Sequence, residues 1–97
     1  MQIIFTREAR FELVEASLYY EGLRPGLGGD FEAEITYYLH SVAAAPELPR
    51  LRKGDYRRVN LRRFPYYISY SIEQGAVIIL AVGHGAHRPE YWIKGKP

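Results

Sequence analysis

The sequence predicts an α+β fold, with an N-terminal strand, a two-helix hairpin and then a three-stranded antiparallel meander. Residues 6–46 repeat apolar side chains at helical spacing, whereas residues 56–73 alternate them with the period of two that strands show, and Val77–Val82 is apolar on both faces. Because helices and hairpins are separated along the chain, both helices are expected to pack on one sheet face. The chain has 97 residues, and we expect residues 1–97 to form one domain.

The first half of the chain is predicted to hold a short strand and two helices. Residues 3–5 are β-formers, and Thr6 is a suitable N-cap for the helix that follows. This helix is expected to end by Glu21-Gly22, and a second to run from Gly28-Gly29-Asp30 until Pro46 stops it. Their apolar faces comprise Ala9, Leu13, Ala16 and Tyr20, then Phe31, Ile35, Tyr38, Leu39 and Val42.

Three strands are predicted in the second half, over Tyr56–Phe64, Tyr66–Glu73 and Val77–Val82. The polar positions of the first two strands point away from the predicted helices. These positions are Arg58, Asn60 and Arg62, beside Tyr67, Ser69 and Ser71. We expect this sheet face to be open, either as a surface for phosphate and base contacts or as an ordinary solvated face with charges on its edge.

Charge divides the chain into two halves. Residues 1–49 carry three basic and eight acidic side chains, whereas residues 50–97 carry ten basic and three acidic ones. Residues 50–63 alone hold seven basic side chains, and this asymmetry indicates a surface for a polyanion or an acidic partner. Most acids, including Glu8, Glu12 and Glu15, are expected on outward helix faces.

Several classes of protein are excluded or disfavoured. The chain has no cysteine, which excludes disulfides and thiolate sites and favours a reducing cytoplasm. The apolar run Ala76–Val82 is too short to span a membrane, and the N-terminus does not read as a signal peptide. The acids after residue 50 are scattered, so we expect neither a metal site nor a cofactor, and reject the His84–His87 pair as a metal site.

Side chains capable of chemistry gather after the last predicted strand. They are His84, His87, Arg88, Tyr91 and Trp92. A His or Tyr there could act as general acid or base in RNA cleavage, and an Arg could stabilise the charged phosphate. The simpler interpretation is that His84 bonds to the backbone at a strand end, while Tyr91 and Trp92 lock the tail onto the core.

The ordered motifs resemble those of the RelE/ParE superfamily of type II toxin–antitoxin toxins over nearly the whole chain. Their residues resemble the ParE, or plasmid-stabilisation, branch more closely than the RelE branch. They are Glu12-Leu13-x-Glu15-Ala16-x-x-Tyr19-Tyr20, Gly26-Leu27-Gly28-x-x-Phe31, Pro46, Arg63-Phe64-Pro65-Tyr66, Ile68-x-Tyr70 and Ala81-Val82-x-His84-x-x-His87-Arg88-Pro89-x-Tyr91-Trp92. The resemblance implies a small cytoplasmic toxin, neutralised in a hetero-oligomer by an antitoxin whose C-terminal segment wraps around it.

The resemblance also implies two possible targets. ParE-like members inhibit DNA gyrase, whereas RelE-like members cut mRNA on the ribosome without a metal. A non-toxic basic module that binds nucleic acid is a third possibility. If the chain is an RNase, the implied catalytic residues are Arg62, Arg63, His84, Arg88 and Tyr91. The residues expected to bind target or antitoxin are Lys53, Arg57, Arg58, Asn60, Arg62, Arg63, His87 and Trp92. Lys53 stands alone where RelE-like toxins supply several lysines, which favours the gyrase-directed branch.

Overall fold

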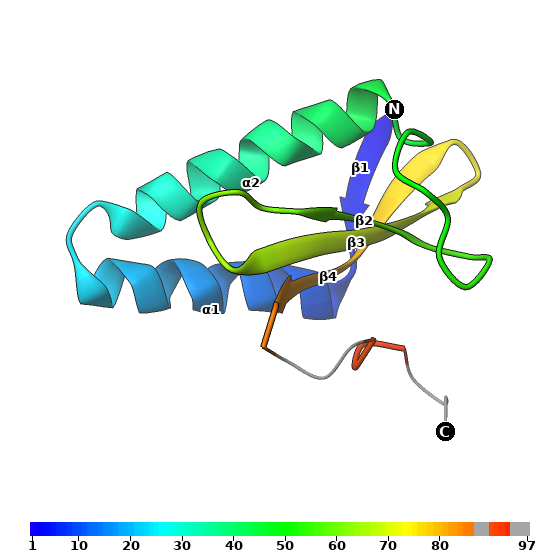
Figure 1. Ribbon diagram of the computed structural model, residues 1–97. Helices are drawn as coiled ribbons and strands as arrows, with labels where there is room; N and C mark the ends of the chain where they lie inside the picture. The colour runs from blue at the N-terminus through cyan, green and yellow to red at the C-terminus, as the bar shows by residue number, and fades with distance from the viewer. Residues whose placement is uncertain (87–89, 94–97) are drawn as a thin grey trace.

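The computed structural model describes residues 1–86 and 90–93, and it places two helices against a four-stranded sheet (Figure 1). The elements are β1 (Gln2–Phe5), α1 (Arg7–Leu23), α2 (Leu27–Ala44), β2 (Arg57–Asn60), β3 (Tyr66–Glu73) and β4 (Ala76–His84). The strand order is β1-β4-β3-β2, with β1 parallel to β4 and the other pairs antiparallel. The α+β prediction is confirmed, and the parallel β1 makes the sheet mixed.

Local chemistry sets most element boundaries close to those predicted. The Thr6 hydroxyl accepts a hydrogen bond from the Ala9 N–H at 3.1 Å, which confirms the predicted N-cap. α1 continues through Gly22 to Leu23, slightly beyond the expected end. α2 starts at Leu27, directly after Gly26, whose φ of 90° suits a residue without a side chain.

β2 is shorter than the predicted Tyr56–Phe64 strand, because residues 61–65 turn toward α2. The backbone N–H groups of Arg62 and Arg63 both donate to one carboxylate oxygen of Glu34, at 2.8 Å each. Those two N–H groups therefore bond to a helix side chain instead of extending the pairing with β3. Phe64, in the same turn, is buried against Phe31 of α2, with ring centroids 5.2 Å apart.

The core lies between the helices and one face of β3 and β4. Its most buried members come from both helices and from alternating strand positions. They include Ala9, Ala16, Phe31, Ile35, Ile68, Tyr70, Val77, Ile79 and Val82. This packing confirms the apolar stripes predicted for both helices. Within the described residues, neither helix is long and apolar enough to cross a membrane.

Glu12 corrects the expectation that the α1 glutamates face solvent. One of its carboxylate oxygens accepts a hydrogen bond from the Val82 N–H at 2.9 Å, and the other accepts from the Tyr91 hydroxyl. β4 extends beyond the end of β1, and Ile79 is its last residue paired with β1. Glu12 of α1 therefore satisfies an amide that has lost its strand neighbour.

Candidate functional site

The edge strand β2 presents a polar face away from the helices. Arg58 and Asn60 pair with Ser69 and Tyr67 of β3, so all four side chains share that face. The Arg58 guanidinium carbon lies 4.0 Å from the centre of the Tyr67 ring, and its Nε donates to the Asn60 side chain at 3.0 Å. Stacking and this bond fix the guanidinium plane, and the remaining four N–H groups suit a carboxylate or phosphate.

Residues 90–93 cover part of the sheet face that was expected to be open. The Trp92 indole donates to the Tyr67 hydroxyl at 3.2 Å and meets the Tyr56 ring edge-on, with centroids 4.7 Å apart. Tyr67 is only 3% exposed and Ser69 is fully buried. The prediction of an open face is therefore wrong at Tyr67 and Ser69, whereas Asn60, Arg62 and Arg63 remain exposed.

The described tail residues are fastened by hydrogen bonds as well as by ring contacts. Glu90 accepts from the Tyr56 hydroxyl and forms an ion pair with Lys53 at 3.3 Å. Burial, followed by the hydrogen bond to Glu90, raises the pKa of Tyr56 to about 12. These contacts confirm the interpretation that Trp92 holds the tail against the core. The ion pair between Lys53 and Glu90 also holds the tail in place.

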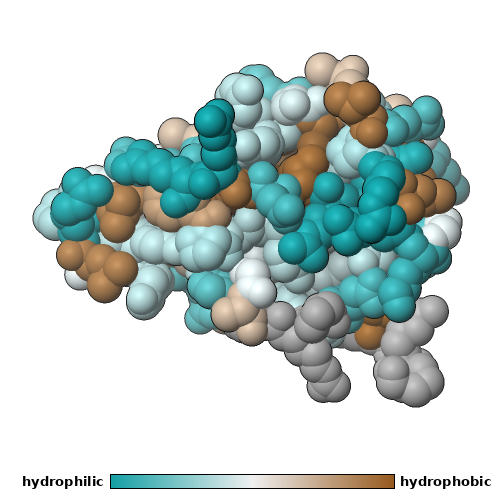
Figure 2. Space-filling view, in the orientation of Figure 1, coloured by the Kyte–Doolittle hydropathy of each residue, from teal (hydrophilic) through white to brown (hydrophobic). Residues whose placement is uncertain are grey.

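The arginines of residues 57–63 divide between two sides of the sheet. Arg57 pairs with the core residue Tyr70, so it lies on the helix side, where its Nε is buried and has no hydrogen-bond partner among the described residues. Arg63 reaches α2 and pairs with Asp30 at 3.1 Å. Arg62 is exposed. Arg58 and Arg62 therefore remain the best placed to meet a partner. On the face shown in Figure 2, hydrophilic side chains gather over β2 and the loop before it.

His84 and Tyr91, the described acid–base candidates, hold structural positions. The His84 ring meets Tyr66 edge-on at 4.9 Å between centroids, and its Nδ1 accepts from the Ala86 N–H at 2.9 Å. It borders a hollow of about 200 Å³ against Glu15 of α1, on the helix side of the sheet. Burial and the hydrogen bond to Glu12 raise the pKa of Tyr91 far above its ordinary value, so its hydroxyl gives up its proton less readily than a free tyrosine does.

The structure brings some of these candidates near one another. The Gly85 N–H donates to the Pro65 carbonyl at 2.7 Å, which places the end of β4 beside the turn that carries Arg62 and Arg63. His84 packs against Tyr66, Arg63 pairs with Asp30, and Tyr91 donates to Glu12. His87 and Arg88 lie outside the described residues. Within the described part of the chain, no group of three His, Cys, Asp or Glu could hold a metal ion.

One further surface was missed by the sequence analysis, on the outward side of α1. Phe11, Val14 and Leu18 are 61%, 50% and 68% exposed. Their spacing of three and four residues places them on one helical face. The signal in the sequence is a second apolar stripe in α1, besides the one that faces the core.

Comparisons with known proteins agree with this fold. The family model of the ParE toxin of type II toxin-antitoxin system, parDE, matches residues 3–89. Proteins named Toxin ParE2, from two strains of Mycobacterium tuberculosis, are 31% identical over 84 residues, which is 80% of this chain and 75% of theirs.

Two solved structures share the architecture. The chromosomal ParDE TA system from P. aeruginosa gives a TM-score of 0.74 at 19% identity, covering 87% of this chain and 95% of that one. The isolated E. coli RelE toxin gives 0.68 at 18% identity, covering 93% of this chain and 89% of that one. At these identities the two likenesses show the fold alone.

Proposed function

This chain belongs to the ParE family of toxins of type II toxin–antitoxin systems, and on that premise we propose that it arrests growth by inhibiting DNA gyrase until its antitoxin neutralises it. Membership of the family makes the chain a ParE-like toxin with an antitoxin as partner. The identity of the target is the proposed step. It extends what the sequence motifs imply for the ParE branch.

The observation that carries the choice of target is the engagement of Tyr91. Metal-free RNA cleavage needs a general acid and base whose pKa values lie near neutrality and whose atoms reach the substrate. The Tyr91 hydroxyl donates to Glu12, and burial moves its pKa further above neutrality. The His84 ring packs against Tyr66 on the helix side of the sheet, opposite the face of Arg58. These contacts favour a toxin that acts by binding over one that cleaves RNA.

We place the contact with the target on the exposed part of the β2 face. Arg58 is held flat on Tyr67, and Arg62 follows it in the adjoining turn. Guanidinium groups fixed in this way recognise carboxylates or phosphates with two parallel hydrogen bonds. An acidic protein surface or a DNA segment bound to gyrase offers both kinds of acceptor.

A supercoiling assay tests the proposal. The purified chain should stop gyrase from supercoiling relaxed plasmid, and Arg62→Gln or Arg58→Gln should each weaken the inhibition about tenfold, equivalent to about 1.4 kcal/mol. Arg24→Gln is the matched control because Arg24 is an exposed arginine at the end of α1. It should inhibit like the original chain. Supercoiling that continues unchanged at all toxin concentrations would rule out gyrase as the target.

The two other candidate functions would give different results in cells that express the chain. An mRNA endonuclease would leave supercoiling intact and create new ends in translated messages, phased to the ribosomal A site, which primer extension detects. A non-toxic nucleic-acid-binding module would cause no growth arrest and would lose affinity steeply as salt rises.

A further inference from the structure

Tyr67 stands at a point of the sheet where three segments of the chain meet. It pairs with Gly83 of β4, and a Cβ built on that glycine would lie 2.6 Å from the Tyr67 hydroxyl oxygen. From β2, the Arg58 guanidinium carbon lies 4.0 Å from the centre of the same ring. Because Tyr67 is almost fully buried, its ring is packed between these neighbours and has little room to turn.

The missing side chain of Gly83 makes this place available. Non-bonded heavy atoms pack best about 3.5–4.0 Å apart, so a residue with a Cβ could not stand at position 83 while the ring keeps its position. Any larger residue would displace the ring, and with it the surface on which Arg58 lies. Gly83 therefore contributes to the geometry of Arg58 without touching it.

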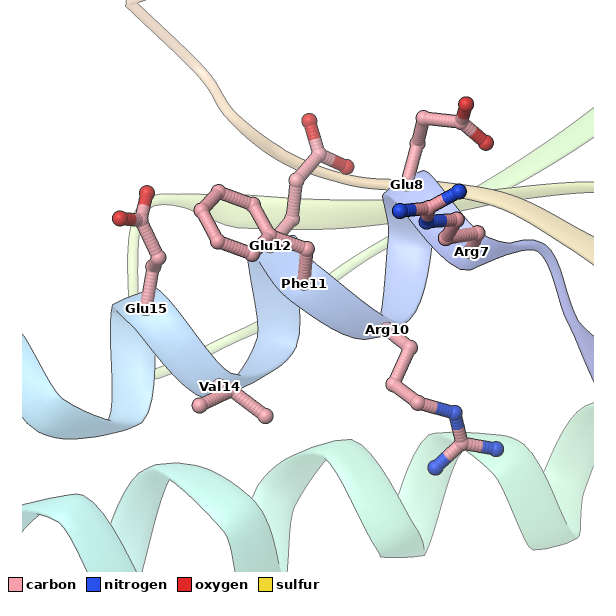
Figure 3. A pocket seen from close by; sticks show the side chains of 7 residues that line it. All are labelled: Arg7, Glu8, Arg10, Phe11, Glu12, Val14 and Glu15. Atoms are coloured by element: carbon pink, nitrogen blue, oxygen red, sulfur yellow. The ribbon is translucent and has the colours of Figure 1, made fainter.

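The tail holds the hydroxyl end of the ring. The Trp92 indole N–H donates to the Tyr67 hydroxyl at 3.2 Å. The residue before it is anchored as well, because the Tyr91 hydroxyl donates to Glu12. Figure 3 shows the Glu12 carboxylate on the side of α1 away from Arg10. Trp92 is thus a fixed point against which the Tyr67 ring is held.

A fixed ring matters for the guanidinium that rests on it. A mobile arginine that binds a partner loses rotational freedom, and this loss lowers the affinity. Arg58 is already restrained by the Tyr67 ring and by the Asn60 side chain, which accepts a hydrogen bond from its Nε at 3.0 Å. Its other N–H groups are therefore directed before any partner arrives.

We propose that Tyr67 is the positioning residue for Arg58, that Gly83 gives the ring its place, and that Trp92 fixes the hydroxyl end of the ring. Tyr67 is too buried to meet the target itself, so it acts through the guanidinium. The inference rests on the proposed contact between Arg58 and the target, and it is independent of gyrase as the identity of that target.

A purely structural role for Tyr67 would give a different pattern of losses. If Tyr67 only stabilised the sheet, its replacement would weaken the toxin through a smaller folded fraction, and this effect would add to that of Arg58→Gln. If Tyr67 acts through Arg58, the two substitutions remove the same interaction. Their combined effect then hardly exceeds either one alone.

A double-mutant cycle in growing cells separates these roles. The toxin level that halves the growth rate should rise about tenfold for Tyr67→Leu and for Arg58→Gln, and by no more than about twofold further when both are combined. Tyr37→Leu is the matched control, because Tyr37 is an exposed tyrosine of α2. It should arrest growth like the original chain.

Circular dichroism establishes that each variant is folded. If Tyr67→Leu unfolds, Trp92→Phe takes its place in the cycle. It keeps an aromatic ring beside Tyr56 but loses the N–H that reaches Tyr67. Its expected loss is smaller, about threefold, and should likewise disappear when Arg58 is already replaced.

Nitrogen-15 NMR of the full chain tests the geometry without any target. Trp92 is the only tryptophan, so its indole N–H signal is unambiguous, and the Arg58 Nε–H signal is identified by its loss in Arg58→Gln. Trp92→Phe and Gly83→Ala should each shift the Arg58 signal. Arg58→Gln should shift the indole signal in turn, because coupling through Tyr67 is reciprocal. Tyr37→Leu should shift neither signal.

Two results would overturn the proposal. They are additive losses of growth arrest in the cycle, and an Arg58 signal that stays in place in the folded Tyr67 or Trp92 variant. A chain that arrests growth but leaves gyrase supercoiling untouched would refute the proposed target alone, since neither the growth cycle nor the NMR signals require gyrase.

Discussion

At the scale of single residues, Glu12 joins three parts of the fold, because its carboxylate links α1 to the Val82 amide of β4 and to Tyr91 near the chain end. We expect Glu12→Ala to lower the free energy of unfolding by about 1–3 kcal/mol, since it leaves the Val82 N–H without a partner. Urea denaturation measures the loss. Glu15→Ala, one turn away and exposed, should stay within about 0.5 kcal/mol of the original chain. If both variants lost the same free energy of unfolding, the two glutamates would act only through the charge that they add to α1, and the bond to Val82 would contribute nothing.

The raised pKa of Tyr56 predicts that the stability of the fold depends on pH. Burial raises its pKa in the folded chain to about 12, against about 10 in the unfolded chain. The folded state therefore retains a proton that the unfolded state releases, so this contribution to stability is complete below about pH 10 and declines toward about pH 12. Urea midpoints measured from pH 8 to 12 should fall less steeply for Tyr56→Phe. A decline of the same slope in both chains would contradict this role.

Residue-level prediction succeeded where a side chain's role depends on its own helix and failed where it depends on a distant segment. Thr6 as an N-cap and Phe31 as a core residue follow from local pattern and hydrophobicity. The inward role of Glu12 depends on how far β4 extends past β1, which the spacing of apolar residues in α1 does not encode. The cover over Tyr67 likewise depends on Trp92, which comes twenty-five residues later in the chain.

At the scale of elements, the helical hairpin depends on close contact at the start of α2. A Cβ on Gly28 would lie 2.6 Å from the Ser17 carbonyl oxygen of α1, whereas one on Gly29 would meet no atom within 4 Å. We expect Gly28→Ala to cost about 1–3 kcal/mol through overpacking, and Gly29→Ala to stabilise the helix by up to about 1 kcal/mol. Thermal unfolding of the two variants gives the comparison. A Gly28→Ala chain as stable as Gly29→Ala would show that the helices can separate at no cost.

Element boundaries show the same division between local and distant causes. The period of two predicted β3 as Tyr66–Glu73, which is its observed extent. It also extended β2 through residues 61–64, because alternation continues there. In the structure the Arg62 and Arg63 amides bond to Glu34 of α2. Strand pairing ends where a helix side chain competes for the amides, and that competition is not visible in the strand's own sequence.

At the scale of the whole molecule, the charge asymmetry of the chain becomes two separate surfaces. The helical hairpin carries Phe11, Val14 and Leu18 between charged edges, and the opposite side of the sheet carries Arg58 beside the exposed Arg62. The sequence predicted the basic surface, and both the target and the antitoxin were expected to bind there. Trp92 covers part of this sheet face, whereas α1 exposes three large apolar side chains. We therefore expect separate sets of residues to control toxicity and neutralisation.

This separation gives a prediction for paired variants. Arg58→Gln/Arg62→Gln should lose growth arrest and gyrase inhibition while its affinity for the antitoxin stays within about threefold, because exposed ion pairs add little to a complex anchored by apolar contacts. Arg24→Gln, at an exposed arginine at the end of α1, should keep both properties. Plating after induction, with and without the antitoxin, measures both properties in one strain. If the double variant lost toxicity and antitoxin binding together, the two partners would share this surface, and the expected separation would be wrong.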